Sequence, residues 1–280
     1  MEQFSASQVQ VQGFCAHLKK QEKSEATVEK YLRDVRAFCA FAGEGVIDKT
    51  TVMAYKAYLG ERYAVASANS MLAALNAFLR FCGAGELAVK RFVVQRQVFC
   101  EEQKELTREE YYRLVGAASK LKKERLCLIL QTICGTGIRV SELQYITVEA
   151  VHRGEANVNC KGKNRRILLV SALRKKLARY AKAQKIQAGS IFVTSRGKPI
   201  SRNYVWRQMK SLCKRAGVLP SKVFPHNLRH LFARTFYSME KDIAKLADIL
   251  GHSSIDTTRI YIVTTSTEHL KKMQRMHLIL

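Results

Sequence analysis

The sequence predicts a mainly α-helical fold with a small antiparallel β-sheet, of the α+β class, arranged in two domains. Its 280 residues exceed the roughly 100–200 residues that are usual for one domain. Apolar residues recur at helical spacing over much of the chain, whereas a basic turn near residue 161 separates two short segments of β type. These observations predict a helical N-terminal domain over residues 1–100 and a second domain, with the small sheet, over residues 106–280.

The N-terminal part is predicted to be a bundle of about four helices. The first covers residues 7–20, and Ser24, Asp48 and Ser67 each precede apolar residues at helical spacing. Ser and Asp side chains accept hydrogen bonds from the free N–H groups of a first helical turn, so these residues are expected to begin the other three helices. Residues 92–105 follow neither the helical nor the strand period, and we expect them to form the linker.

The second domain is predicted to begin with a helix after Thr107, because Thr107 and Glu110 have the spacing of a capping box. Pro225 suits a first helical turn and favours an extended Phe224, so another helix should start immediately before His226. Strands are expected at residues 145–151, 156–159 and 166–170, and further helices at 126–133, 171–185, 201–216, 227–238 and 241–250.

The charge balance indicates a polyanionic partner. The chain has 48 Lys and Arg residues against 23 Asp and Glu residues, which gives a net charge of +25. An excess on this scale attracts nucleic acid, and basic residues spread along the whole chain fit a membrane surface less well than one amphipathic segment would. We therefore expect nucleic acid as partner, and the alternative interpretation is a basic protein whose charge serves only solubility.

The sequence also argues against several other protein classes. It has no run of about 18 apolar residues, and its first residues lack the pattern of a signal peptide. Its eight cysteines include no C-x-x-C pair, so a zinc site is not expected. Cysteines without a secretory signal suit a reducing compartment, so we expect a cytoplasmic protein.

Two motifs place an arginine three residues from a second polar side chain. His226 and Arg229 share a helix face at a helix start, where free N–H groups help to hold a phosphate. Arg139 and Glu142 have the same spacing, so the carboxylate can orient the guanidinium. Each motif alone also occurs by chance, as a surface helix or a surface ion pair.

Two further motifs come from the hairpin and from the end of the second domain. Lys161 lies at the predicted hairpin tip, from which a lysine can reach a DNA groove, although a solvated basic turn is commoner. Gly251 is expected to end one helix, and Ser253 with Asp256 to begin another. His252 then lies at the joint, and Tyr261 lies about two turns later.

Together the segments GTGIRVSEL, CKGKNRRILLV, PHNLRHLFA and LGHSSIDTTRIY resemble the tyrosine recombinase (phage integrase) family. The catalytic resemblance spans about residues 106–262, and the N-terminal helices resemble the family's core-binding domain. It implies a two-domain site-specific recombinase of the Xer-like or integrase type. Such an enzyme cleaves and rejoins DNA through a 3′-phosphotyrosyl intermediate and gives integration, excision or resolution.

The resemblance implies a role for each matching residue. Tyr261 is the nucleophile, and Lys161 is the general acid for the leaving 5′-hydroxyl. Arg139 and Arg229 hold the scissile phosphate. Because a phenol with a pKa near 10 costs roughly 4 kcal/mol to ionise at pH 7, nearby cations are expected to stabilise the phenolate and the charge on the phosphorane.

The supporting set consists of His226 and His252, which donate hydrogen bonds to the phosphate, and Glu142. Two guanidiniums can do what metal ions do in other phosphoryl-transfer sites, so no metal and no cofactor are expected. The phosphotyrosine bond keeps the energy for rejoining, so ATP is not expected either.

Several choices stay open. Lys163 can reach the same groove as Lys161, which is preferred because it matches the family's Lys-Gly position, and His230 is interpreted as structural. Many Xer-type members have Thr-His where this chain has Ile262-Val263, which argues against a role in resolving chromosome dimers. The rival functions are DNA relaxation like that of a type IB topoisomerase and a non-catalytic DNA-binding regulator.

The expected assembly is a homotetramer in the synaptic complex, formed from a free monomer or weak oligomer. The amphipathic tail from Thr267 to Leu280 is expected to dock on a neighbouring protomer, or alternatively on its own domain.

Overall fold

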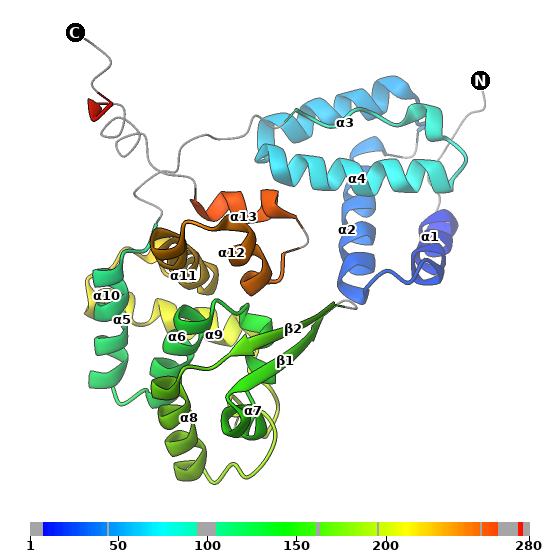
Figure 1. Cartoon of the computed structure of the whole chain (residues 1–280). Coiled ribbons are helices and arrows are strands. Elements are labelled where there is room, and N and C mark those ends of the chain that lie inside the picture. Colours follow the sequence, from blue (N-terminus) through cyan, green and yellow to red (C-terminus); the bar gives the residue numbers. More distant parts are fainter. Residues whose placement is uncertain are drawn as a thin grey trace. The chain divides into compact units, whose positions relative to one another are not determined.

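The computed structural model divides the chain into two compact units, Met1–Arg96 and Gln97–Leu280, which are described separately (Figure 1). The structure describes residues 8–43, 45–93, 105–160, 163–194, 196–252, 254–262 and 274–276. The fold is mainly helical with one two-stranded antiparallel sheet, as the sequence predicts. In the part of the chain that is described, no helix combines the length and apolar character needed to cross a membrane.

The described residues of the first unit form the helices α1 (Gln8–Lys20), α2 (Glu25–Ala42), α3 (Lys49–Arg62) and α4 (Val65–Phe81), followed by the 3₁₀ helix η1 (Gly85–Leu87). α4 packs against α2 and α3, and Phe38, Tyr55 and Phe78 are almost fully buried between them. The predicted cap at Asp48 is confirmed, because its side chain accepts a hydrogen bond from the Thr51 N–H at 2.7 Å. The predicted start at Ser67 is wrong: α4 begins one turn earlier, because the alanines around Ser67 favour a helix without a capping side chain.

The chain after α4 is fixed to that helix by two asparagines. The Asn76 side chain donates to the Val89 carbonyl at 2.8 Å and accepts from the Val89 N–H at 3.0 Å. Asn69 makes the same pair of bonds to Phe92, at 2.9 and 2.8 Å. The predicted linker over residues 92–105 therefore begins at an anchored residue, and most of it, residues 94–104, lies outside the described part of the chain.

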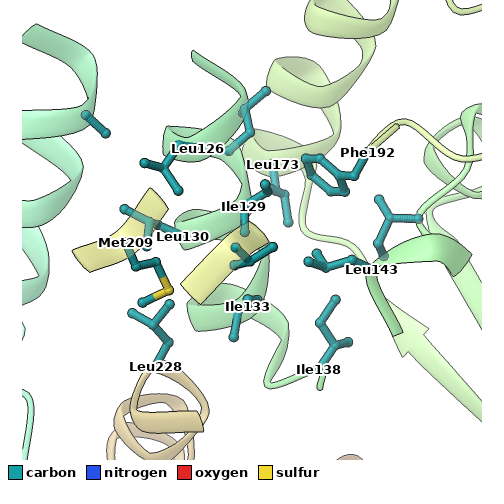
Figure 2. Close-up of a cluster of buried hydrophobic side chains, with 14 of the residues drawn as sticks. Leu126, Ile129, Leu130, Ile133, Ile138, Leu143, Leu173, Phe192, Met209 and Leu228 are labelled. Atoms are coloured by element: carbon teal, nitrogen blue, oxygen red, sulfur yellow. The ribbon is translucent and has the colours of Figure 1, made fainter. Parts of the chain in front are cut away.

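The second unit is built around α6 (Glu124–Thr136), which contacts helices from most of the unit. Figure 2 shows Ile129, Leu130 and Ile133 of α6 between Met209 and Leu228 on one side and aromatic and aliphatic residues on the other. The helices around it are α5 (Arg108–Lys120), α8 (Ser171–Ala183), α9 (Arg202–Lys210) and α11 (Pro225–Glu240), with the short α10 (Cys213–Ala216) and the 3₁₀ turn η4 (Pro220–Lys222). The capping box of Thr107 and Glu110 at the start of α5 is confirmed.

The sheet is a hairpin of β1 (Glu155–Cys160) and β2 (Lys163–Leu168), which extends from the helices of this unit (Figure 1). The predicted strand at 145–151 is wrong. The 3₁₀ helix η3 (Val140–Tyr145) and the helix α7 (Val148–Arg153) cover it instead, because Thr147 caps α7 and Gly154 ends it in the left-handed conformation. The single helix predicted over 201–216 is interrupted at Ser211, whose hydroxyl donates to the Gln208 carbonyl at 2.8 Å.

Two helix ends and the helix α13 (Ile255–Ile262) position the residues discussed below. α11 begins at Pro225 after an extended Phe224, as predicted. α12 (Ile243–Leu250) ends at Gly251 in the left-handed conformation, also as predicted. α13 follows α12 and carries Tyr261.

Candidate active site

Arg229 on α11 lies at the ends of two other helices. Its side chain is 1% exposed and donates to the Gly137 carbonyl at 2.6 Å and to the Leu250 carbonyl at 2.8 Å. These carbonyls lie at the C-terminal ends of α6 and α12, where helix dipoles place partial negative charge. The two helices thereby compensate a cation whose desolvation would otherwise be costly.

The glycines of two sequence motifs allow the helix ends to lie close to their neighbouring side chains. Gly137 has φ +67°, and a Cβ there would lie 2.4 Å from the Phe232 ring. Gly251 has φ +64°, and a Cβ there would lie 2.6 Å from the Arg165 side chain. Both positions therefore require glycine for backbone conformation and for space, which explains them in GTGIR and LGH.

Glu142 forms ion pairs with two arginines. Its carboxylate is buried and accepts from the Arg139 backbone N–H at 2.8 Å and from the Arg139 guanidinium at 2.9 Å. It also accepts a close hydrogen bond from Arg165 of β2, which donates in addition to the Ile249 carbonyl at 2.6 Å. Arg139 keeps 42% of its side chain exposed, so Glu142 orients it while leaving it accessible to an anion.

Tyr261 is buried among three histidine rings. Its ring centroid lies 5.8 Å from that of His226, 4.5 Å from that of His230 and 5.5 Å from that of His252. The His252 ring is stacked on it with 9° between the planes. Tyr261 also interacts with Arg229 and raises the pKa of its guanidinium, so the phenol lies near the buried cation.

The partners of His252 define its tautomer. Arg229 Nη2 lies 2.9 Å from Nε2 of His252, and because a guanidinium can only donate, Nε2 accepts. In the neutral ring Nδ1 then carries the proton and donates to the Thr258 hydroxyl at 2.8 Å. Thr258 is fully buried on α13, so this bond connects the histidine to the helix of Tyr261.

The two motif histidines are held neutral. Burial lowers the pKa of His252 to about 4, with further lowering from the positive charges of Arg229 and Arg139. Burial likewise lowers the pKa of His226 to about 4, together with His230 and Arg229. Burial also lowers the pKa of Arg229, against the opposing effect of its interaction with Tyr261. At neutral pH His226 and His252 therefore add no positive charge to that of the arginines.

The structure brings together most of the residues that the sequence singles out. Arg139, His226, Arg229, His252 and Tyr261 converge. Glu142 is next to Arg139, whereas Lys161 lies outside the described residues, between the end of β1 and the start of β2. Within the described ranges, no group of three or more His, Cys, Asp or Glu residues could hold a metal ion.

Sequence reasoning missed Arg165, Thr258 and Glu105. Arg165 could have been found from strand alternation, because it lies two residues before the buried Ile167 and pairs with the buried Val158. Thr258 lies three residues before Tyr261, so helical spacing places the two side chains near each other. No local pattern indicates Glu105, whose partners are more than 100 residues away in the sequence.

Comparison with known proteins finds matches to both units of the chain. The profile of the phage integrase family matches residues 104–268, and that of the phage integrase N-terminal SAM-like domain matches residues 11–84. The chain is 30% identical to the tyrosine recombinase XerA of Pyrococcus furiosus over 275 residues, which cover 95% of this chain and 93% of the relative. It is also 30% identical to the tyrosine recombinase XerC of Thermodesulfovibrio yellowstonii, over 91% of each chain.

Among solved structures, a lambda integrase tetramer bound to a Holliday junction has the same fold. The TM-score is 0.72 at 19% identity, with 92% of this chain and 77% of that chain covered. The family match extends over more than half of the sequence and includes every segment that contributes to the cluster around Tyr261. The chain therefore belongs to the phage integrase family.

Proposed function

We propose that this protein is a site-specific tyrosine recombinase, which cleaves and rejoins DNA strands through a covalent 3′-phosphotyrosyl bond at Tyr261. The observation that carries the proposal is the surroundings of the Tyr261 phenol. It contacts the buried cation Arg229 and the rings of His226 and His252. A phenol in such surroundings is suited to attack a phosphodiester, because cations stabilise both the phenolate and the charged phosphorane.

The cleavage step is a transesterification. The Tyr261 oxygen forms a bond to the scissile phosphorus, the bond from phosphorus to the 5′-oxygen breaks, and the phenolic proton passes to water. Lys161 donates a proton to the departing 5′-oxygen. Rejoining is the reverse reaction with a 5′-hydroxyl from another strand, so neither ATP nor a metal ion takes part.

Arg139 and Arg229 bind the phosphate in this proposal. Arg139 has an exposed guanidinium that Glu142 holds in place. In Arg229 the two terminal nitrogens are engaged, whereas Nε is buried without a hydrogen-bond partner among the described residues. A buried donor without an acceptor is costly, and a phosphate oxygen would satisfy it.

His226 and His252 supply neutral donors to the phosphate. Nε2 of His252 accepts from Arg229 in the free protein, so the neutral ring must exchange tautomer before Nε2 can donate. The Thr258 hydroxyl permits that exchange, because it can accept from Nδ1 or donate to it. A bound phosphate favours the change, since the anion attracts the donor form.

The domains and partners follow from the same proposal. Residues 1–100 act as the core-binding domain and residues 106–280 as the catalytic domain, both on double-stranded DNA. Four copies assemble in the synaptic complex, as in the lambda integrase tetramer, and the free protein is a monomer or weak oligomer. The tail from Thr267 to Leu280, of which only residues 274–276 are described, contacts a neighbouring protomer. The protein acts in the cytoplasm.

The test is a suicide DNA substrate with a nick next to the cleavage position, which traps the covalent intermediate. Wild-type protein should give an SDS-resistant adduct, and Tyr261→Phe should give none. Tyr237→Phe is the matched control, because Tyr237 packs on the same cluster as Tyr261 and should leave the adduct intact. DNA binding without any adduct would indicate a regulator, and plasmid relaxation that needs no partner site would indicate a topoisomerase.

A further inference from the structure

His230 is the third histidine around Tyr261, and the proposed function gives it no role. It lies on α11 four residues after His226 and four before Arg234, so the three side chains share one helix face. Its ring meets both His226 and Tyr261 edge to face, at centroid distances of 4.8 and 4.5 Å and with 71° between the planes in each case. A rotation of the His230 ring would therefore disturb the nucleophile.

The Glu105 carboxylate contacts this ring. Its Oε1 lies 3.5 Å from Nδ1 of His230, and its Oε2 lies 3.2 Å from the Arg234 guanidinium. A carboxylate only accepts, so Nδ1 of His230 carries the proton on the side of Glu105. Both side chains are largely buried, with 14% of Glu105 and 16% of His230 exposed.

The carboxylate is held in its charged form. Burial raises the pKa of Glu105. The hydrogen bond from His230 and the charge of Arg234 lower the pKa by more than burial raises it, so the resulting pKa is below the ordinary value. Arg234 also donates to the Leu106 carbonyl at 2.7 Å, which anchors the backbone next to Glu105. Glu105 is thus a fixed anion, and Arg234 compensates its charge so that it does not oppose a phenolate nearby.

We propose that Glu105 and His230 are positioning residues for the nucleophile: Glu105 fixes the His230 ring, and His230 holds the Tyr261 ring against the residues that bind the phosphate. This inference rests on the proposed function of Tyr261. His230 comes from the same helix as His226 and Arg229, so it ties the phenol to the phosphate-binding residues. Glu105 comes directly after residues 94–104 and is the last residue of the predicted linker. The residues that position Tyr261 therefore include the one at which the linker ends.

A double-mutant cycle tests the pair as a unit, with single-turnover formation of the SDS-resistant adduct as readout. Glu105→Ala and His230→Ala should each slow adduct formation by about tenfold to a hundredfold, the range expected from a small misplacement of a reacting group. The double variant should be no slower than the slower single variant, because either change releases the same ring. Independent, multiplying losses would overturn the proposal, as would wild-type rates in both single variants.

A second reaction separates positioning of the nucleophile from binding of the phosphate. In Tyr261→Phe protein, hydrogen peroxide can serve as the external nucleophile, so that a peroxide oxygen bonds to phosphorus and the 5′-hydroxyl leaves. Adding Glu105→Ala should leave this reaction and DNA affinity unchanged, because no tyrosine has to be held. An equal loss in the peroxide and tyrosine reactions would overturn the proposal.

Glu110→Gln is the matched control. The Glu110 carboxylate is as buried as that of Glu105 and pairs with Lys222 at 3.0 Å. It belongs to the capping box of α5, so its loss reports general destabilisation. We expect wild-type adduct rates for Glu110→Gln.

His230→Asn should recover part of the rate that His230→Ala loses, because its amide keeps an N–H donor for Glu105. A failure of the wild-type protein to form any adduct would instead refute the proposed function, which the same gel reveals separately.

Discussion

The two motif arginines occupy opposite surroundings. Arg229 is 1% exposed and held by the carbonyls of Gly137 and Leu250, whereas Arg139 is 42% exposed and held by the Glu142 carboxylate. Arg229 thus connects the ends of α6 and α12 and also lies near Tyr261. Among the described residues, the Arg139 side chain makes no such connection between helices. The comparison implies that one of the two proposed phosphate-binding residues also stabilises the fold, so changes at the two positions should affect stability and activity differently.

The largest effect is expected from Arg229→Lys. A single ammonium group cannot reach both carbonyls and His252 as the planar guanidinium does. We expect adduct formation to fall by about a thousandfold, as for the loss of a key donor to a transition-state anion. The stability of the catalytic unit should fall by about 3 kcal/mol, as when a buried charge loses its partners. Chemical denaturation and the suicide substrate measure the two effects, and wild-type stability would contradict the structural role of Arg229.

Arg139→Lys should lower activity without a comparable loss of stability. The lysine cannot bind the phosphate with two donors while also pairing with Glu142, so we expect about a hundredfold slower adduct formation. Denaturation midpoints should stay close to wild type, because the side chain is half exposed. A destabilisation as large as that of Arg229→Lys would remove the distinction between the two arginines.

A smaller effect on adduct formation is expected from changes at Thr258, which bonds to His252 next to Arg229. Thr258→Val keeps the shape but leaves the Nδ1 proton of His252 without its acceptor, whereas Thr258→Ser keeps the hydroxyl. Loss of one buried hydrogen-bond partner corresponds to about tenfold in rate. We expect slower adduct formation for the valine variant and near wild-type rates for the serine variant. Equal rates in the two variants would show that the hydroxyl has no part in orienting His252.

The smallest effect concerns pH. The pKa of His252 is about 4 in the folded protein against about 6.5 in an unfolded chain, so the unfolded state binds more protons between these values. The stabilising contribution of the neutral ring is therefore complete above about pH 6.5 and is lost as the pH falls towards 4. Thermal unfolding at several pH values should show a weaker pH dependence in His252→Gln than in wild type. An identical dependence would contradict a neutral His252 beside Arg229.

The sequence predicts the elements around these residues better than it predicts their contacts. Pro225, Thr107 and Gly251 act through local chemistry that is visible in a few neighbouring residues, and the helix boundaries that they imply are confirmed. The sequence predicts a strand at residues 145–151, yet Thr147 and Gly154 delimit a helix there. The period of a short apolar segment does not distinguish the two.

The contacts that organise the site join residues far apart in the chain. Arg229 meets Gly137 across 92 positions and Arg234 meets Leu106 across 128. A single sequence contains no signal for such pairs, so Glu105 emerges only from the folded chain, whereas strand alternation and helical spacing give local signals for Arg165 and Thr258. By contrast, the motif residues could be named because their order and flanking segments resemble one family.

The central claim is that Tyr261 becomes covalently linked to DNA, and direct identification of the linked residue tests it. The suicide-substrate adduct is digested with protease and nuclease, and the remaining peptide carrying a nucleotide is sequenced by mass spectrometry. The account predicts a single 3′-phosphotyrosyl bond at Tyr261 within the peptide that contains Ile260 and Ile262. A nucleotide on another residue, or one linked through its 5′-phosphate, would contradict it.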